Sequence, residues 1–517
     1  MSILHKRIGY LLALLLITAT LLLAMGHMPQ AEGAAFSSSA GDADFAAIDA
    51  YLIEQMAELR IPGLALGIVH GDRVVHLKGF GIADPTGRAV TAQTPFVLNS
   101  ISKSFVALAV MQLVEQGRIE LDAPLQRYLP WFQVADTTVA SQITVRQLLN
   151  HTSGLPASTA YPELARPATA TDTLEARVRR LHTTPLNRPV GTTFEYTDAN
   201  YDLLGLLVQT VTGQPYSRYI QQAILQPLGM TRSATMQPAA LPPDLAIGYR
   251  SWFGWPVPFT QWYAHAMLPS GDLIATAEDM THYLAAQLNG GRYGDQQLLS
   301  PQGIAILHEP AVPEGRGDRF YGMGWISRSL NGIPVVRHDG TSANYYADVV
   351  LDPAEKWGVV ILLNFNSFHL NGGRIQALSG GIVSLLHDQP PPTLPAMHHP
   401  ILYPLLLTIW GVTGFLLLWS AHSLWIWRRR QLRRRSVGLR LALPLLWALV
   451  LLGLVPQITY PLAVLCINIP DFGYTLWVCG VSMVLWCCVW AGVNWFGGRQ
   501  RITEVSVADR VVTPVNL

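Results

Sequence analysis

The 517-residue sequence predicts an α+β domain followed by a transmembrane domain of three helices. Two apolar, β-branched segments, Leu64–Val69 and Val74–Phe80, flank a short turn and predict a hairpin near the start of the domain. Two similar segments, Tyr345–Leu351 and Gly358–Asn364, predict a second hairpin near its end. The sequence between the hairpins is mostly helical in pattern. We therefore expect an antiparallel sheet that is built from both ends of residues 43–388, with a helical subdomain inserted.

The N-terminal segment has the layout of an export signal. His5-Lys6-Arg7 precede an uncharged apolar stretch from Ile8 to Met25, and small residues follow it. This pattern indicates a signal peptide over residues 1–26. An uncleaved signal anchor is the alternative, because the stretch is long enough to span a bilayer. With either a signal peptide or a signal anchor, the domain that follows is exported. Residues 27–42 are small and polar and predict a linker.

The exported domain, residues 43–388, is expected to begin and end with a helix. Asp44–Leu59 has a helical pattern that stops before Pro62. Arg374–His387 has a similar pattern directly after the second hairpin.

A proline-rich segment, residues 389–400, separates this domain from three apolar segments and is expected to be a stiff, extended linker. The three segments are about Ile401–Trp427, Leu441–Ala463 and Tyr474–Phe496, within residues 401–496. Each is long enough to cross a bilayer. Helices buried in a protein core are the alternative interpretation.

Positive charge predicts the orientation of these spans. The run Arg428–Arg440 carries seven arginines between the first two spans, and such an excess indicates the cytoplasmic side. The exported domain then lies outside the cytoplasm, and residues 497–517 form a cytoplasmic tail. The lipid bilayer is therefore an expected partner.

Charge and cysteine content exclude other classes of partner for the exported domain. The net charge is only +1, so the composition gives no indication of nucleic-acid binding. All four cysteines lie in the last 55 residues, so the exported domain has neither disulfides nor a cysteine metal site. Only four of the 35 basic residues are lysines, and one of these is Lys103.

The segment Ser100-Ile101-Ser102-Lys103 opens a long apolar run, which predicts a buried helix ending at Gly117. Residues three apart share a helix face, so Ser100 and Lys103 should meet at the first turn, where free backbone N–H groups can stabilise an anion. A hydroxyl, an amine that can lose its proton when buried, and an anion site are the parts of an activated serine nucleophile. The alternative is a structural role, with Ser100 as an N-cap and Lys103 solvated.

Two further segments carry polar residues that can face a cleft. Tyr196 precedes an apolar helical segment, Leu203–Val211, and beside a cationic lysine its phenol is a candidate base. A half-buried packing role is the alternative. Val335–Thr341 predicts a strand that contains His338 and Gly340, and a glycine there lets a substrate approach the backbone closely. A lone histidine is more commonly a surface or core residue.

Together these segments resemble the serine β-lactamase and penicillin-binding-protein family, specifically its class C β-lactamase-like branch (peptidase S12 type). The S-x-x-K motif is Ser100–Lys103, Y-x-N falls on Tyr196–Asp198, and K-T-G, often H-x-G in this branch, falls on His338–Gly340. Ile143–Leu155 is similar to the family's I-T-x-x-x-L-L-x-H-T-S-G-L segment. The resemblance covers residues 43–388 and implies the β-lactamase/transpeptidase-like fold.

The resemblance implies catalysis through an acyl-enzyme. Ser100 would attack a carbonyl carbon, and Lys103 with Tyr196 would take its proton and pass it to the leaving group. The backbone N–H groups of Ser100 and Thr341 would form the oxyanion hole. Water would then hydrolyse the acyl-enzyme, and neither a metal ion nor an organic cofactor is needed.

The expected substrate-binding residues are Asp198, His338 and Gly340, and two of them depart from the family pattern. Asp198 replaces an asparagine that can donate to a substrate carbonyl, whereas an ionised aspartate only accepts. It could instead hold Lys103 charged or bind a substrate amine. His338 stands where β-lactamases and carboxypeptidases carry a lysine that binds the substrate carboxylate, which neutral histidine does poorly. We therefore expect a peptidase or esterase acting on small-molecule or peptide substrates without a terminal carboxylate.

The membrane segments add a resemblance to colibactin-type prodrug-activating peptidases, which remove an N-acyl-D-amino-acid cap from an exported natural product. Their acidic residue three positions before the serine is Val97 here, a departure from that substrate pocket. Three alternatives stay open: a penicillin-binding receptor that is acylated without turnover, a β-lactamase or D,D-carboxypeptidase, and an inactive scaffold. We expect a monomer or weak oligomer.

An aromatic stretch from Trp252 to Tyr263 is a candidate for an acyl pocket or for contact with the lipid surface. Ordinary loop packing is the alternative.

Overall fold

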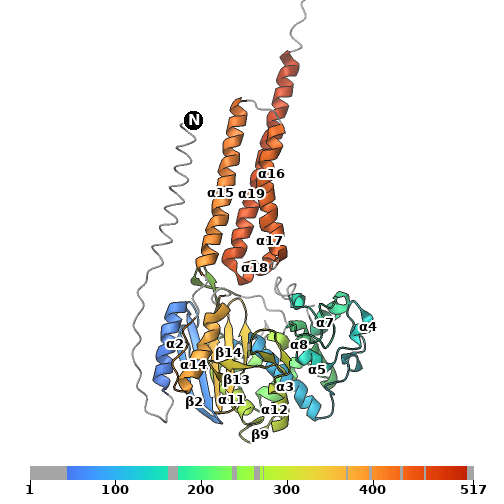
Figure 1. The fold of residues 1–517 in the computed structure, drawn as a ribbon, viewed down its shortest axis with the longest axis vertical. Coiled ribbons are helices and arrows are strands. Elements are labelled where there is room, and N and C mark those ends of the chain that lie inside the picture. The colour runs from blue at the N-terminus through green and yellow to red at the C-terminus, as the bar shows by residue number, and fades with distance from the viewer. Residues whose placement is uncertain are drawn as a thin grey trace, which may run out of the picture. The chain divides into compact units, whose positions relative to one another are not determined.

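The fold is built on an eight-stranded antiparallel sheet, which a computed structural model of the chain shows in Figure 1. The strand order is β10-β11-β12-β13-β14-β15-β1-β2, so the first strands of the chain lie beside the last. β1 pairs with β15 from Leu64↔Leu363 to His70↔Trp357. The predicted α+β fold, with a sheet drawn from both ends of the domain, is thereby confirmed. The structure describes residues 44–160, 173–235, 241–260, 268–271, 273–367, 371–394, 399–430, 435–458 and 461–508.

The predicted signal segment and linker, residues 1–26 and 27–42, lie outside the described residues.

The central strands are buried along almost their whole length, because helices cover both faces of the sheet. The sheet consists of β1 (Gly63–His70), β2 (Arg73–Gly81), β10 (Val312–Pro313), β11 (Phe320–Tyr321), β12 (Ile326–Leu330), β13 (Ile333–Thr341), β14 (Tyr346–Asp352) and β15 (Trp357–Leu363). Smaller sheets contain β3 (Phe96–Val97), β4 (Ala234–Thr235), β7 (Leu273–Ala275), β5 (Tyr249–Trp252), β6 (Trp255–Pro258), β16 (Phe365–Asn366), β8 (Arg292–Tyr293) and β9 (Gln296–Gln297).

Two helices from opposite ends of the domain, α2 (Phe45–Leu59) and α14 (Gln376–Leu386), pack together on one face of the sheet. Their close approach depends on Gly381, where a Cβ would lie 2.3 Å from the Tyr51 hydroxyl. The other face is covered by α11 (Ala277–Leu288). Both terminal helices agree with the sequence prediction, with boundaries that differ by one or two residues.

The predicted helical middle lies between β2 and β10. Its central helix, α3, is buried from Ser102 to Leu113 and packs against α8, so the two helices share one hydrophobic core. α8 ends at Gly213, which adopts a left-handed conformation with φ of 73°. The helices are α3 (Ser102–Glu115), α4 (Thr137–Ala140), α5 (Val145–Leu149), α7 (Leu174–Arg180), α8 (Asp198–Thr212), α9 (Tyr216–Ile220), α10 (Leu268–Gly271), α11 and α12 (Pro301–His308).

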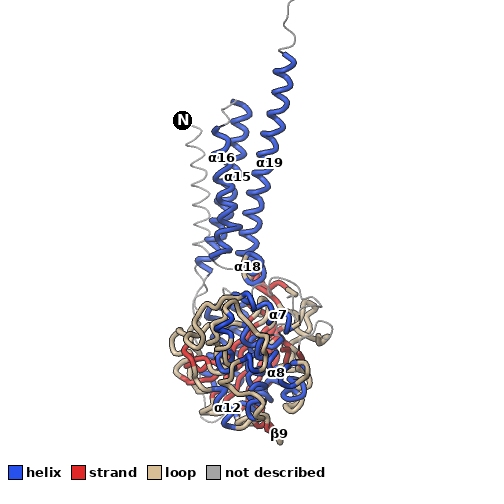
Figure 2. The backbone as a smooth tube through the Cα atoms, turned by 90° about the vertical axis from the view of Figure 1, so that its right-hand side faces the viewer, coloured by secondary structure: helices blue, strands red, loops and turns tan. Residues whose placement is uncertain are grey.

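Two C-terminal helices are long and apolar enough to cross a membrane (Figure 2). They are α15 (His399–Arg430) and α19 (Pro470–Ala508), and their apolar spans cover Leu402–Ile426 and Pro470–Val493. These agree with the first and third predicted spans.

The second predicted span differs from the expected single helix. It contains α16 (Arg435–Leu449), a π-helical turn (Val450–Leu454), α17 (Val455–Ile458) and α18 (Leu462–Asn468), with a bend of 78° before α18. Pro461 stands at the N-cap of α18, where a residue without an N–H group readily starts a new helix. The described helices therefore provide two spans, or three if the bent pair counts as one.

Candidate active site

Ser100 lies on a short 3₁₀ turn, η1 (Asn99–Ile101), that leads directly into α3. Asn99 has a left-handed conformation with φ of 50°, which turns the chain sharply just before the serine. α3 itself begins at Ser102, two residues later than the sequence predicted. The three-residue spacing still brings the Lys103 Nζ atom to 3.1 Å from the Ser100 Oγ atom.

Lys103 is completely buried, and its amine contacts three acceptors. Nζ donates to Ser100 Oγ at 3.1 Å, to Asp198 Oδ1 at 2.7 Å and to the Ser270 carbonyl at 2.7 Å. These contacts satisfy all three N–H donors of an ammonium group. Burial opposes the positive charge, but the Asp198 carboxylate and the Tyr196 phenol outweigh it and raise the pKa of Lys103. The amine that the sequence predicted as a proton acceptor is therefore held as an ammonium ion.

Tyr196 stands in the loop that precedes α8, two residues before the first residue of this helix. Its ring centroid lies 4.9 Å from the Lys103 Nζ atom. Burial raises the pKa of Tyr196, while the charge and hydrogen bonding of Lys103 and Ser100 act in the opposite direction. Within the described residues the buried hydroxyl makes no well-aligned hydrogen bond. The structure thus brings the three predicted catalytic side chains together.

A support for Tyr196 that the sequence did not predict comes from His151. The His151 carbonyl accepts from the Glu195 backbone N–H at 2.9 Å, and its Nδ1 atom accepts from the Thr197 backbone N–H at 3.3 Å. The imidazole also lies against the Tyr196 ring, with centroids 4.4 Å apart. The Asn200 amide donates to the same Nδ1 atom at 3.0 Å. One histidine therefore holds the residues on both sides of Tyr196.

His151 is fully buried, and this burial, followed by repulsion from Lys103, lowers the pKa of the imidazole well below its usual value. The side chain is neutral, so it supports Tyr196 without adding charge. Its only signal in the sequence is its place in the family segment Ile143–Leu155. No local pattern connects it with a tyrosine that follows much later in the chain.

Strand β13 passes directly beside the turn that carries Ser100. A Cβ on Gly340 would lie 2.0 Å from the Leu98 carbonyl oxygen, so this strand can approach the turn only with glycine there. The sequence predicted that this glycine admits a substrate, whereas in the structure it admits the neighbouring turn. Ser100 and Thr341 both line the adjacent pocket, as an oxyanion hole formed by their backbone N–H groups requires.

His338 is buried, and both of its ring nitrogens have partners. Nδ1 donates to the Asp339 carbonyl at 2.7 Å, and Nε2 accepts from the Tyr321 hydroxyl at 3.1 Å. Burial lowers the pKa of His338 to about 4, despite the nearby Asp339 carboxylate. A neutral ring with both nitrogens engaged is a poor ligand for a substrate carboxylate.

The pocket beside Ser100 has a volume of about 510 Å³. Among the predicted site residues, Tyr196, His338 and Thr341 also line it, whereas Asp198 contacts Lys103 and Gly340 contacts the turn. Sequence reasoning missed its charged lining. These side chains are Glu195, Glu314, Arg316, Arg319 and Asp339.

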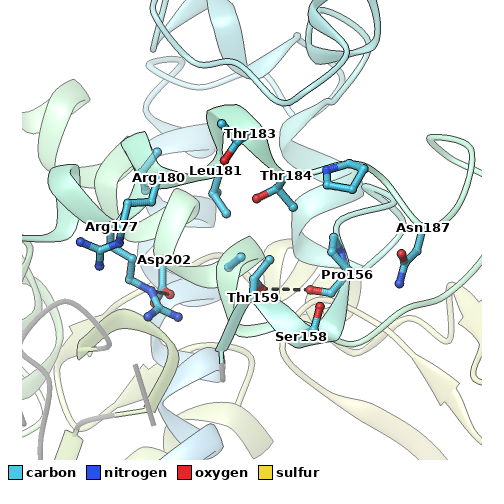
Figure 3. Close-up of a pocket in the computed structure, with 13 residues that line it drawn as sticks. Pro156, Ser158, Thr159, Arg177, Arg180, Leu181, Thr183, Thr184, Asn187 and Asp202 are labelled. Carbon is cyan, nitrogen blue, oxygen red and sulfur yellow. Dashed lines mark hydrogen bonds and ion pairs between the residues drawn. The ribbon is translucent and has the colours of Figure 1, made fainter. Parts of the chain in front are cut away.

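A second pocket, of about 390 Å³, is shown in Figure 3. It is lined in part by Pro156 and Thr159, whose hydroxyl donates to the Pro156 carbonyl at 2.9 Å, and by the buried ion pair between Arg177 and Asp202, with Nε and Oδ2 2.5 Å apart. Burial raises the pKa of Asp202 to about 6, against the opposing effect of Arg177. Ala157, between Pro156 and Thr159, lines the pocket beside Ser100, so the two pockets share this short segment.

A serine hydroxyl, a buried ammonium and a buried phenol meet in an α+β fold, and these are the groups that an activated serine nucleophile would need. The Beta-lactamase family model matches residues 48–377, and the chain belongs to this family.

Relatives and solved structures agree with this assignment. Protein flp of Staphylococcus aureus is 29% identical over 330 residues, which cover 62% of this chain and 63% of the relative. Penicillin-binding protein 4 of Amycolatopsis lactamdurans is 29% identical over 321 residues, covering 60% of this chain and 82% of the relative. The octameric penicillin-binding protein homologue of Pyrococcus abyssi superposes with a TM-score of 0.59 at 28% identity, covering 67% of this chain and 78% of that one. The chain thus spans less than two thirds of the length of its flp relatives.

Proposed function

We propose that the protein is a membrane-anchored, extracytoplasmic serine hydrolase that acts through an acyl-enzyme on amide, peptide or ester substrates. The observation that carries this proposal is the contact between Lys103 Nζ and Ser100 Oγ, 3.1 Å apart, at a pocket that Tyr196 also lines. A structural role for Ser100 would require neither a buried lysine beside it nor an open pocket in front of it.

The proton of Ser100 passes to Tyr196 in this mechanism. Lys103 cannot accept it, because its three N–H donors are all engaged and the Asp198 carboxylate stabilises its charge. The ammonium instead stabilises the Tyr196 phenolate, which is the form that takes the proton. Ser100 Oγ forms the bond to the carbonyl carbon as its O–H bond breaks.

Collapse of the tetrahedral intermediate breaks the bond to the leaving group, which takes the proton from Tyr196. Backbone N–H groups of Ser100 and Thr341 stabilise the oxyanion. Water then attacks the carbonyl carbon of the Ser100 ester and transfers a proton to the phenolate. As the bond between this carbon and Ser100 Oγ breaks, Oγ takes the proton back from Tyr196, so the acid is released and the enzyme returns to its starting state.

The state of His338 favours substrates without a terminal carboxylate. Its nitrogens bind Tyr321 and the Asp339 carbonyl, and its pKa is lowered to about 4 by burial. Amides, N-acyl-D-amino amides and simple esters are therefore preferred over β-lactams and D-alanyl peptides.

Membrane anchoring is supported by α15 and α19, whose apolar spans are long enough to cross a bilayer. The seven arginines of Arg428–Arg440 support a cytoplasmic position for the loop after α15 and an outside position for the catalytic domain.

The full chain in detergent or nanodiscs tests the activity. A fluorescent phosphonate should label the wild type and not Ser100→Ala. The wild type should hydrolyse N-acyl-D-amino amides or p-nitrophenyl esters faster than nitrocefin. Ser102→Ala is the matched control, because this buried hydroxyl accepts from the Leu273 backbone N–H at 3.1 Å and is not part of the described pocket lining. Faster turnover of nitrocefin would contradict the substrate class, and permanent labelling without product release would favour the receptor alternative.

A further inference from the structure

Exposed apolar side chains gather at one place on the catalytic part of the chain. Among the described residues 44–394, eight large apolar side chains are exposed, and four of them belong to the β5–β6 hairpin or directly precede it. They are Ile247, Phe253, Trp255 and Val257, with exposed fractions of 39, 44, 62 and 39%. Phe253 and Trp255 stand at the turn of the hairpin. The exposure of such large apolar side chains to water is unfavourable.

The same hairpin contacts the ends of the apolar helices. The Phe253 backbone N–H donates to Asp471 Oδ1 at 2.8 Å, in the first turn of α19. The Trp252 ring lies 5.3 Å from the ring of Tyr474, and the Phe253 ring lies 6.4 Å from that of Tyr403 near the start of α15. The hairpin turn is therefore continuous with the helix ends, where tyrosine and tryptophan side chains favour the boundary between lipid and water.

Lipid fits this surface better than a protein strand does. β6 is an edge strand, and its Pro256 and Pro258 lack the N–H groups that an added strand would need. A cation is also present, because the Arg60 guanidinium lies 4.2 Å from the Trp255 ring centroid and donates to the Gly254 carbonyl at 2.9 Å. Exposed aromatic groups beside an arginine match the acyl chains and phosphates of a lipid headgroup layer.

We propose that the turn of the β5–β6 hairpin inserts Phe253 and Trp255 into the outer headgroup layer of the membrane that holds α15 and α19. This inference rests on the proposed membrane anchoring. Trp255 then contacts acyl chains, Arg60 contacts lipid phosphate, and the catalytic domain is held against the bilayer surface.

Quenching by brominated lipid tests the insertion in the full chain. The protein is reconstituted into vesicles of phosphatidylethanolamine and phosphatidylglycerol, with or without bromine on the upper part of the acyl chains. The emission lost in Trp255→Phe, obtained by subtraction from the wild type, reports on Trp255 alone. We expect brominated lipid to reduce this emission at least twofold. The matched control is Trp131→Phe, whose indole lies 3.9 Å from the Arg179 guanidinium in the helical part of the domain, and whose emission should not change.

The outcomes separate the two proposals. Equal Trp255 emission in both lipids, while tryptophans of the apolar helices such as Trp410 and Trp477 are quenched, overturns insertion and leaves the anchoring intact; cover by a second copy or another protein would give this result. No quenching of any tryptophan overturns the anchoring and the insertion together. Labelling of Ser100 by phosphonate in each variant establishes that the domain is folded in every sample.

Discussion

Asp198 has the largest influence of any single residue on the charge of Lys103. Burial lowers the pKa of Lys103, but the Asp198 carboxylate acts in the opposite direction and raises it. Burial raises the pKa of Tyr196, and the same carboxylate raises it further. In the proposed mechanism the Tyr196 phenolate accepts the proton of Ser100, and this form becomes more abundant as pH rises. Activity should therefore increase from neutral to alkaline pH.

Replacing Asp198 with asparagine should shift this rise to lower pH, because removal of the carboxylate lowers both pKa values. The measurement is kcat/KM of the full chain as a function of pH. Asp122→Asn, which removes a surface carboxylate paired with Arg146, is the control and should leave the profile in place. An unchanged midpoint in the Asp198→Asn enzyme would contradict the role given to this residue.

Substitution of the proposed proton acceptor, Tyr196, or of the ammonium that stabilises it, Lys103, should reduce turnover strongly. We expect Lys103→Ala and Tyr196→Phe each to lower kcat/KM at least about a hundredfold, the usual effect of losing general acid–base or charge stabilisation. Lys78→Ala, which removes an exposed lysine paired with Asp49, serves as the control. Full activity of Tyr196→Phe would exclude the phenol as the proton acceptor.

His151 offers a test of positioning without direct contact with a substrate. His151→Phe keeps a ring against Tyr196 but removes the Nδ1 acceptor, so the buried N–H groups of Thr197 and Asn200 lose their partner. His151→Asn keeps an acceptor and tolerates the left-handed conformation at this position, where φ is 59°. We expect kcat to fall about tenfold or more in the first variant and less in the second, with KM nearly constant.

The measurement that separates positioning from folding is kcat together with the melting temperature. Equal loss of kcat in both His151 variants, or a loss that follows the melting temperature alone, would show that the histidine serves only the fold.

At the scale of elements, the site depends on the contact between β13 and the η1 turn. Gly340→Ala would place a Cβ 2.0 Å from the Leu98 carbonyl, so the strand and the turn must separate and the two backbone N–H groups of the proposed oxyanion hole move apart. We expect a loss of kcat of about a hundredfold, comparable to removal of an oxyanion donor, together with a lower melting temperature.

Gly380→Ala is the matched control for this change. It lies within α14, where only the Asn331 side chain is close to the added carbon, at 3.7 Å, and alanine favours a helix over glycine. This variant should keep full activity with an equal or higher melting temperature. A Gly340→Ala enzyme with normal kcat would show that the strand does not set the oxyanion hole.

The elements themselves follow closely from local patterns. Apolar segments and the turn residues between them placed β1, β2, β14 and β15 within two residues of their observed ends, because such patterns depend on neighbours in the chain. The second apolar segment was expected to be one membrane-spanning helix. It instead bends by 78°, a feature that depends on proline positions and on packing against α19.

At the scale of the whole molecule, the proposed topology predicts the location of both termini of the apolar region. A fluorescent protein fused after Leu517 should fold and fluoresce, since the tail lies in the cytoplasm. Alkaline phosphatase inserted after Thr393, before α15, should be active, since that segment lies outside.

Replacing the arginines between Arg428 and Arg440 by glutamine should weaken this orientation, because the positive-inside bias depends on them. Active phosphatase at the C-terminus of the unaltered chain would contradict the topology. Reporters inserted at Gln389 and after Val515 provide independent checks of the outside position and of the cytoplasmic position, respectively.

The sequence alone determined the family motifs, the spacing of Ser100 and Lys103, the two hairpins and the apolar spans, because each depends on a period or pattern within a short stretch of chain. Only the tertiary structure decided that Asp198 holds Lys103 as an ammonium, that His151 supports Tyr196 and that Gly340 admits the turn that carries Ser100. These contacts join residues that are far apart in the chain. Their energies depend on burial and on distances of a few ångströms, which no local pattern records.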